Sequence, residues 1–104
     1  MRRTYQQIKK RVTEEKFNFT VHALERCVER GIQPVEVKEA LLHGEIIEDY
    51  PHDKYGPSAL IFGVTNNRKI LHVLCSIDPV WVITAYDPTE TELEWDSTYK
   101  RRKQ

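Results

Sequence analysis

Apolar residues recur at helical spacing at the start of the chain. In the basic segment 1–16, Tyr5, Ile8 and Val12 fall on one narrow stripe of an otherwise polar sequence. Spacings of three and four residues place side chains on one face of an α-helix. The segment therefore predicts an amphipathic helix, and its thin apolar stripe predicts that this helix is peripheral.

Two more helices are predicted by their end signals. Thr20 is a suitable N-cap for a helix that runs through Arg30, and Gly31 is a typical C-terminal stop. Pro34 suits the first turn of a third helix, which Gly44 ends. The residues of the third helix predicted to face the core are Val37, Ala40 and Leu41.

From residue 45 onward the pattern changes to short β-branched or aromatic runs separated by turn residues. These runs are 45–50, 58–64, 69–77 and 80–86. Three helices followed by four strands predict an α+β fold, with the helices packed on an antiparallel sheet of four or more strands. Beyond the strands, the sequence around Trp95 predicts a short helix or an extra strand, followed by a basic tail at 98–104.

The last two strands allow a prediction of register. Alternation assigns the core face to Leu71, Val73, Cys75 and Ile77 in one strand and to Trp81, Ile83 and Ala85 in the next. Matching the two core faces requires a three-residue loop at 78–80. Val82, Thr84 and Tyr86 then share the other, less apolar face, where His72 lies directly across from Tyr86.

The composition is that of one folded domain. The chain has 104 residues, of which 39% are hydrophobic and 31% charged, so we expect a single domain over 1–104. No apolar run approaches the roughly 20 residues that span a bilayer, and the N-terminus lacks the apolar stretch of a signal peptide. We therefore expect a cytoplasmic protein, with Cys27 and Cys75 as reduced thiols in the core.

The formal net charge is zero, but its distribution is uneven. Residues 1–16 hold six Lys or Arg and two Glu, whereas residues 98–104 hold four basic residues and no acidic one. The intervening residues 17–97 hold six basic and fourteen acidic residues. Basic ends fit contacts with a nucleic-acid backbone or with an acidic protein, and the neutral total argues against a strong non-specific nucleic-acid binder.

Five side chains have the chemistry needed for RNA cleavage without a metal. His22, Arg26 and Arg30 share one stripe of the second helix, and His72 and Tyr86 are predicted to pair across two strands. Cleavage needs a base for the ribose 2′-hydroxyl, a cation for the phosphate and an acid for the leaving 5′-oxygen. Histidine titrates near neutral pH, and arginine can donate two parallel hydrogen bonds to a phosphate.

Each of these residues also has an ordinary structural explanation. His22 is placed to bond locally at a helix start, and ion pairs with neighbouring glutamates account for Arg26 and Arg30. His72 is equally compatible with a hydrogen-bonded, half-buried histidine, and Tyr86 with a plain strand aromatic. Because the histidines follow no metal-ligand spacing, we expect no metal and no other cofactor.

Taken in order, several short motifs resemble a bacterial family known as domain of unknown function 4258. The motifs are TVHALERCVERGI, LLHGEIIEDYP, GPSALIFG, ILHVLC and VITAYDP, followed by Glu94-Trp95 and the basic run Lys100-Arg101-Arg102. This family is similar to the RelE, BrnT and MqsR toxins, which have compact α+β folds and metal-independent endoribonuclease activity. The polar positions that the resemblance implies for the site are His22, Arg26, Arg30, His72, Tyr86, Arg102 and Arg101.

The resemblance implies a RelE-like ribonuclease toxin that cleaves mRNA, free or on the ribosome, and that is bound by a cognate antitoxin such as a zinc-finger protein of the MqsA kind. In this interpretation His72 is the general base or acid, Tyr86 is its partner or orienter, and His22 is a second proton-transfer or positioning group. Arg26 and Arg30 bind the phosphate. Two other classes stay open, namely a non-catalytic module that binds RNA or protein through the same cleft, and an interaction protein whose polar cluster only braces the fold.

Overall fold

The computed structural model describes residues 2–54 and 56–103. The outermost residues of the predicted first helix and basic tail, 1 and 104, therefore lie outside the described residues. In chain order the elements are α1 (Arg2–Thr13), β1 (Phe17–Phe19), α2 (Val21–Arg30), α3 (Pro34–Leu42), β2 (Gly44–Tyr50), β3 (Ser58–Val64), β4 (Ile70–Ser76), β5 (Val80–Tyr86) and the 3-10 helix η1 (Pro88–Glu94).

The strands form one mixed sheet with the order β1-β5-β4-β3-β2. Strands β2 to β5 make the predicted antiparallel meander. The prediction of a purely antiparallel sheet is wrong, because β1 pairs in parallel with β5, Phe17 lying opposite Val80. With only three residues, β1 is too short to produce a recognisable alternation in the sequence.

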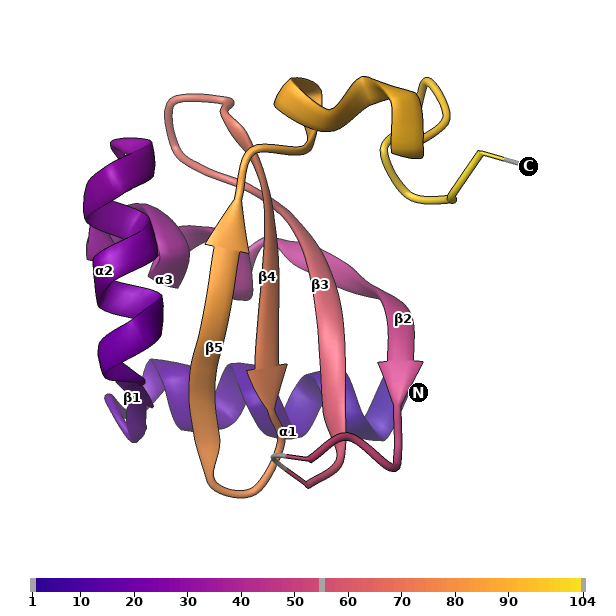
Figure 1. Cartoon of the computed structure of the whole chain (residues 1–104). Coiled ribbons are helices and arrows are strands. Elements are labelled where there is room, and N and C mark those ends of the chain that lie inside the picture. The colour runs from indigo at the N-terminus through magenta and orange to yellow at the C-terminus, as the bar shows by residue number, and fades with distance from the viewer. Residues whose placement is uncertain (1, 55, 104) are drawn as a thin grey trace.

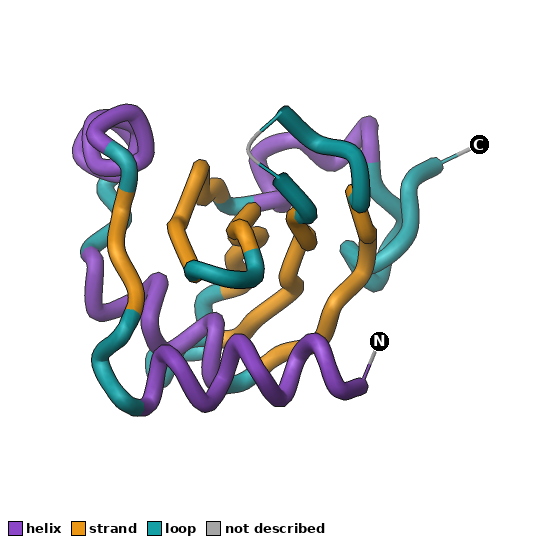
Figure 2. The backbone as a smooth tube through the Cα atoms, turned by 90° about the horizontal axis from the view of Figure 1, so that it is seen from below, coloured by secondary structure: helices purple, strands orange, loops and turns teal. Residues whose placement is uncertain are grey.

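The α-helices lie on one face and along one edge of the sheet. Helices α1 and α3 cover one face, and α2 runs beside β5 (Figure 1). In Figure 2 the molecule is seen from below. Helix α1 runs along one side of the sheet, and α2 lies on the other side, near the sheet edge. The C-terminal segment from Pro88 to Lys103 packs over the other face of the sheet. We call that other face the front face.

Helix α1 is not peripheral, contrary to the prediction. Ile8 and Val12 are completely buried and belong to the main core. Tyr5 fastens the same helix through polar contacts, since its hydroxyl donates to the Leu41 carbonyl at 3.0 Å and accepts from the Gly44 N–H at 2.8 Å. A narrow apolar stripe is enough to bury α1, because its few apolar side chains pack into the core on the face of the sheet opposite the front face.

The predicted ends of α2 are confirmed. Thr20 Oγ1 accepts a hydrogen bond from the Ala23 N–H at 3.0 Å, and Gly31 ends the helix in the left-handed conformation with φ of 66°. Helix α2 contributes Cys27 to the core, and both Cys27 and Cys75 are free, buried thiols as predicted. The cap fixes where α2 starts and so sets which side of it faces β5.

The pairing of His72 with Tyr86 is confirmed, but the register holds over only part of the hairpin. Leu74 pairs with Thr84, and the next pair is Cys75 with Val82, so β5 contains one extra residue at this point. A bulge of this kind moves the following side chains to opposite faces. Consequently Trp81, predicted for the core, is 39% exposed, and Val82, predicted for the other face, is completely buried.

Candidate functional site

Cross-strand pairing arranges the front face into rows. Residues paired directly across neighbouring strands point to the same face of a sheet. One row contains Glu45, Phe62, His72 and Tyr86, from β2 to β5. The next contains Glu48, Leu60, Leu74 and Thr84. The candidate residues of the sheet therefore lie side by side on one surface.

His72 is completely buried, and both of its ring nitrogens have partners. Nε2 lies 2.6 Å from the backbone carbonyl oxygen of Tyr99, and Nδ1 lies 3.1 Å from the Tyr86 hydroxyl oxygen. A carbonyl only accepts hydrogen bonds, so Nε2 carries the proton and donates. In the neutral ring Nδ1 then accepts from the Tyr86 hydroxyl. His72 thus reaches the surface of the site only through Tyr86.

The surroundings of this pair keep both rings uncharged. Burial lowers the pKa of His72 below its ordinary value of 6.5, against the opposing effects of the Tyr99 hydrogen bond and of Glu48. Burial also raises the pKa of Tyr86 to about 12. The ring of Trp95 meets the His72 ring edge to face at a centroid distance of 4.4 Å and excludes water from it. Near neutral pH the pair is a phenol donating to a neutral imidazole.

Arg102 brings a positive charge to the same face. Its Nε and Nη2 donate to the two carboxylate oxygens of Glu48 at 2.8 and 3.1 Å, and its guanidinium lies 4.5 Å from the centre of the Trp95 ring. Burial alone would raise the pKa of Glu48, but hydrogen bonds from Arg102 and Tyr50 lower it overall. The pair is therefore ionic, and the Arg102 side chain remains 51% exposed.

Arg30 approaches the row from the last turn of α2. Its Nη1 donates to the Ala85 carbonyl at 2.7 Å and to Thr84 Oγ1 at 3.3 Å. These bonds occupy one nitrogen of a group that has five N–H donors. A cavity of about 290 Å³ is lined by Arg30, Tyr86, Asp87, Glu90 and Glu94. The guanidinium both fastens α2 to β5 and presents donors beside the Tyr86 ring.

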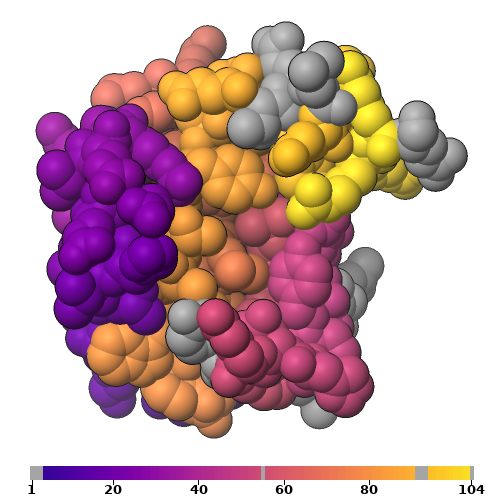
Figure 3. Space-filling view, viewed as in Figure 1, coloured from indigo at the N-terminus to yellow at the C-terminus, as the bar shows by residue number. Residues whose placement is uncertain are grey.

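A hollow of about 270 Å³ lies on the other side of Tyr86. In Figure 3 the front face is recessed between α2 and the strand β2. Tyr86 borders both this hollow and the cavity of Arg30, so it stands between the two arginines. The residues that line the hollow are Tyr50, Asp53, Leu60, Leu74, Thr84, Tyr86 and Arg102. We call the two spaces together the front cleft.

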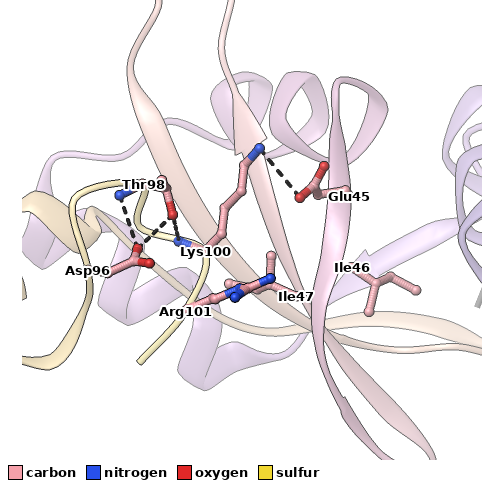
Figure 4. Close-up of a pocket in the computed structure, with 7 residues that line it drawn as sticks. All are labelled: Glu45, Ile46, Ile47, Asp96, Thr98, Lys100 and Arg101. Carbon is pink, nitrogen blue, oxygen red and sulfur yellow. Dashed lines mark hydrogen bonds and ion pairs between the residues drawn. The ribbon is translucent and has the colours of Figure 1, made fainter. Parts of the chain in front are cut away.

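The remaining predicted site residues lie elsewhere. His22 is exposed on the first turn of α2, eight residues before Arg30, which is about 12 Å along the helix axis. Arg26 is partly exposed and donates to both carboxylate oxygens of Glu29, at 2.9 and 3.1 Å. Arg101 borders a separate pocket of about 520 Å³ beside β2. Figure 4 shows this pocket, whose lining includes Arg101 and Ile47.

The chain matches one known family, described as Domain of unknown function (DUF4258), over residues 19–87. The matched segment is more than half of the chain. The chain belongs to this family. No curated protein and no solved structure matches it. Within this DUF4258 chain the matched segment contains His22, Arg26, Arg30, His72 and Tyr86, whereas Arg101 and Arg102 follow it.

Sequence reasoning about this DUF4258 chain missed three contributors to the site. Glu48 and Tyr50 come from β2, where a register shift between Ile46 and Glu48 disrupts the alternation that would have placed them on the front face. Tyr99 contributes a backbone carbonyl, for which residue type gives no signal. The acidic-aromatic character of 45–50 was the available hint for the first two, since a carboxylate and a phenol there can pair with a basic tail.

Neither a metal site nor a membrane span is evident in the described part of the DUF4258 chain. Among the described residues no group of three or more His, Cys, Asp or Glu side chains is arranged to hold a metal ion. A search of the same residues found no helix with the length and apolar character needed to cross a membrane.

Proposed function

We propose that this chain is a metal-independent endoribonuclease that binds single-stranded RNA in the front cleft. The observation that carries the proposal is the placement of the Tyr86 hydroxyl. The hydroxyl is hydrogen-bonded to a buried histidine, and the Tyr86 side chain borders a cleft whose lining includes Arg30 and Arg102. A proton acceptor backed by imidazole, set between two guanidinium groups, fits the needs of phosphodiester cleavage.

The proposed reaction begins with proton transfer through Tyr86. The ribose 2′-hydroxyl gives its proton to the Tyr86 oxygen as the Tyr86 proton moves to Nδ1 of His72. The 2′-oxygen forms a bond to the adjacent phosphorus, and the bond from phosphorus to the 5′-oxygen breaks. The leaving 5′-oxygen takes up one proton from water, and His72 returns to neutral by releasing its proton through Tyr86 to water. The products are a 2′,3′-cyclic phosphate and a 5′-hydroxyl end.

The arginines are assigned to the phosphate. In the described part of the chain the other Arg30 nitrogens have no hydrogen-bond partner, and Arg102 exchanges one of its bonds to Glu48 for a phosphate oxygen. Such donors stabilise the negative charge that grows on the phosphoryl oxygens during attack. Compared with the roles expected from the sequence, Tyr86 becomes the group in contact with RNA and His72 acts behind it. We assign His22, Arg26 and Arg101, which lie outside the front cleft, to contacts with more distant parts of a bound strand.

The RelE-like fold class, the cytoplasmic location and the partners belong to the same proposal. An α+β domain with a mixed sheet and a basic C-terminal segment over its front face is compatible with the RelE class. The expected substrate is mRNA, free or on the ribosome, and the expected partner is an antitoxin such as a zinc-finger protein of the MqsA kind. Arrest of growth on induced expression of the chain, relieved by co-expression of such a partner, is the expected cellular result.

The alternative is a non-catalytic module that binds RNA or protein through the front cleft. It is favoured by the complete pairing of His72 and by the ionic pairing of Arg102 with Glu48, since both also serve to fasten the C-terminal segment. In that case the cleft binds RNA and leaves it intact.

The test uses a change of a single hydroxyl group. Purified wild-type protein and the Tyr86→Phe variant are each incubated with a labelled RNA and, separately, with DNA of the same sequence. The matched control is Tyr5→Phe, which removes the same group on the other side of the sheet. We expect the wild type and Tyr5→Phe to produce 5′-hydroxyl ends on RNA only, and Tyr86→Phe to be slower by about a hundredfold or more.

Two results would reject the proposed mechanism. If the wild type generates no new RNA ends, or if Tyr86→Phe generates them as fast as the wild type, Tyr86 is not the reacting group. RNA retained by the uncleaving wild type, measured by a mobility shift, would support the binding module.

A further inference from the structure

Helix α2 carries an exposed apolar stripe in addition to its buried one. Ala23 and Cys27 face the core, whereas Val21, Leu24 and Val28 are 73%, 42% and 81% exposed. The spacing of three and four residues places the exposed three on one line along the helix. Single exposed aliphatic residues are common, but a continuous line of them on one helix is a feature of surfaces that bind a partner.

The stripe forms the floor of a shallow groove of about 430 Å³. The groove is lined by Val21, Leu24, Val28, Glu25 and Glu29, so both of its charged lining residues are acidic. Arg26 offsets the charge of Glu29 through its two hydrogen bonds. No cation of the described residues lies within ion-pair distance of Glu25, and this carboxylate gives the groove a net negative edge.

A second copy of the chain is a poor occupant. Pairing two α2 helices about a twofold axis near Leu24 would bring the two Glu25 side chains together, and like charges repel. A helix with its own apolar stripe and basic flanks complements both the shape and the charge of the groove.

We propose that α2 docks an amphipathic helix of another protein. Leucine-like side chains of that helix cover Val21, Leu24 and Val28, and a Lys or Arg beside them pairs with Glu25. At 100° per residue the stripe lies on the side of α2 opposite Arg30. A docked helix therefore leaves the front cleft open, and the inference does not depend on the proposed ribonuclease activity.

The test uses two synthetic helical peptides of about three heptads, with leucine at the core positions and either lysine or glutamate at the flanking positions. Binding is followed by fluorescence anisotropy and by amide NMR shifts of the whole chain. We expect the lysine peptide to bind at least tenfold more tightly than the glutamate peptide. We expect the shifts to concentrate at residues 21–29.

Two pairs of variants assign the contacts. Val21→Ser combined with Val28→Ser should weaken binding of the lysine peptide at least tenfold, whereas Val35→Ser, at an exposed valine of α3, should leave it unchanged. Glu25→Lys should reverse the preference between the two peptides, whereas Asp49→Lys, at an exposed position on β2, should not. All five positions are exposed, so the fold is expected to persist.

The proposal is overturned if neither peptide binds, if the two bind equally, or if the shifts map away from α2. It is also overturned if sedimentation shows a dimer that the Val21→Ser, Val28→Ser variant abolishes, because the occupant is then a second copy. Failure of RNA cleavage leaves these measurements unaffected, so the two proposals are tested separately.

Discussion

Mild acid should destabilise the fold through His72. Burial lowers the pKa of this histidine in the folded chain, whereas the unfolded chain titrates at about the ordinary value of 6.5. Between the two pKa values the unfolded state binds more protons, so the free energy of unfolding falls as the pH falls. Above pH 6.5 the stabilisation is fully present. Below it, one proton changes the free energy of unfolding by up to about 1.4 kcal/mol per pH unit.

Urea unfolding between pH 7.5 and pH 5 measures this dependence, with His72→Gln as the comparison. The variant is expected to be less stable at every pH but to lose the slope that begins near pH 6.5. The salt bridge of Glu48 does not interfere, because the lowered pKa of that carboxylate means its stabilisation is lost only below its ordinary value of 4.5. Equal slopes for the two proteins, or a wild type that gains stability on acidification, would refute the assignment of a buried neutral His72.

Two further predictions concern contacts that hold the helices to the sheet. Tyr5→Phe should lower the free energy of unfolding by about 1–3 kcal/mol, because the Gly44 N–H and the Leu41 carbonyl lose their shared partner; urea unfolding measures the loss, and an unchanged midpoint would contradict it. Gly63→Ala should cost more, since a Cβ there would overlap the Ala40 carbonyl oxygen of α3. A melting temperature equal to that of the wild type would show that α3 can shift away freely.

The β4–β5 hairpin shows what alternation can and cannot predict. The pairing of His72 with Tyr86 followed from matching the apolar faces of two strands. The bulge did not, because Val82 and Ile83 are both apolar and give no sign of which one is extra. One inserted residue then sent Trp81 to the surface.

Elements that depend on distant partners were the hardest to predict. Strand β1 is three residues long and exists because β5 offers it a parallel edge. Ile8 and Val12 are buried because α1 covers a sheet formed by residues far along the chain. Local patterns contain no information about such coverage, so the sequence predicted the helix and not its burial.

The candidate site likewise has one part that was predicted from the sequence and one part that depends on tertiary packing. Its side chains on regular elements, His72, Tyr86 and Arg30, were predicted from spacing and from the family resemblance. The fixed tautomer of His72 was not, because it depends on the carbonyl of Tyr99. A backbone atom delivered by an irregular segment is set by tertiary packing alone.

Because the chain is synthesised from its N-terminus, the contact between His72 and the Tyr99 carbonyl forms late. His72 and Tyr86 leave the ribosome before Tyr99, Trp95 and Arg102, and chains are made at about 5–20 residues per second. During that interval the imidazole has no carbonyl to fix its proton and no tryptophan to exclude water. A nascent chain therefore carries an unfinished site, and whatever chemistry the front cleft performs begins only when residues 95–102 have been added.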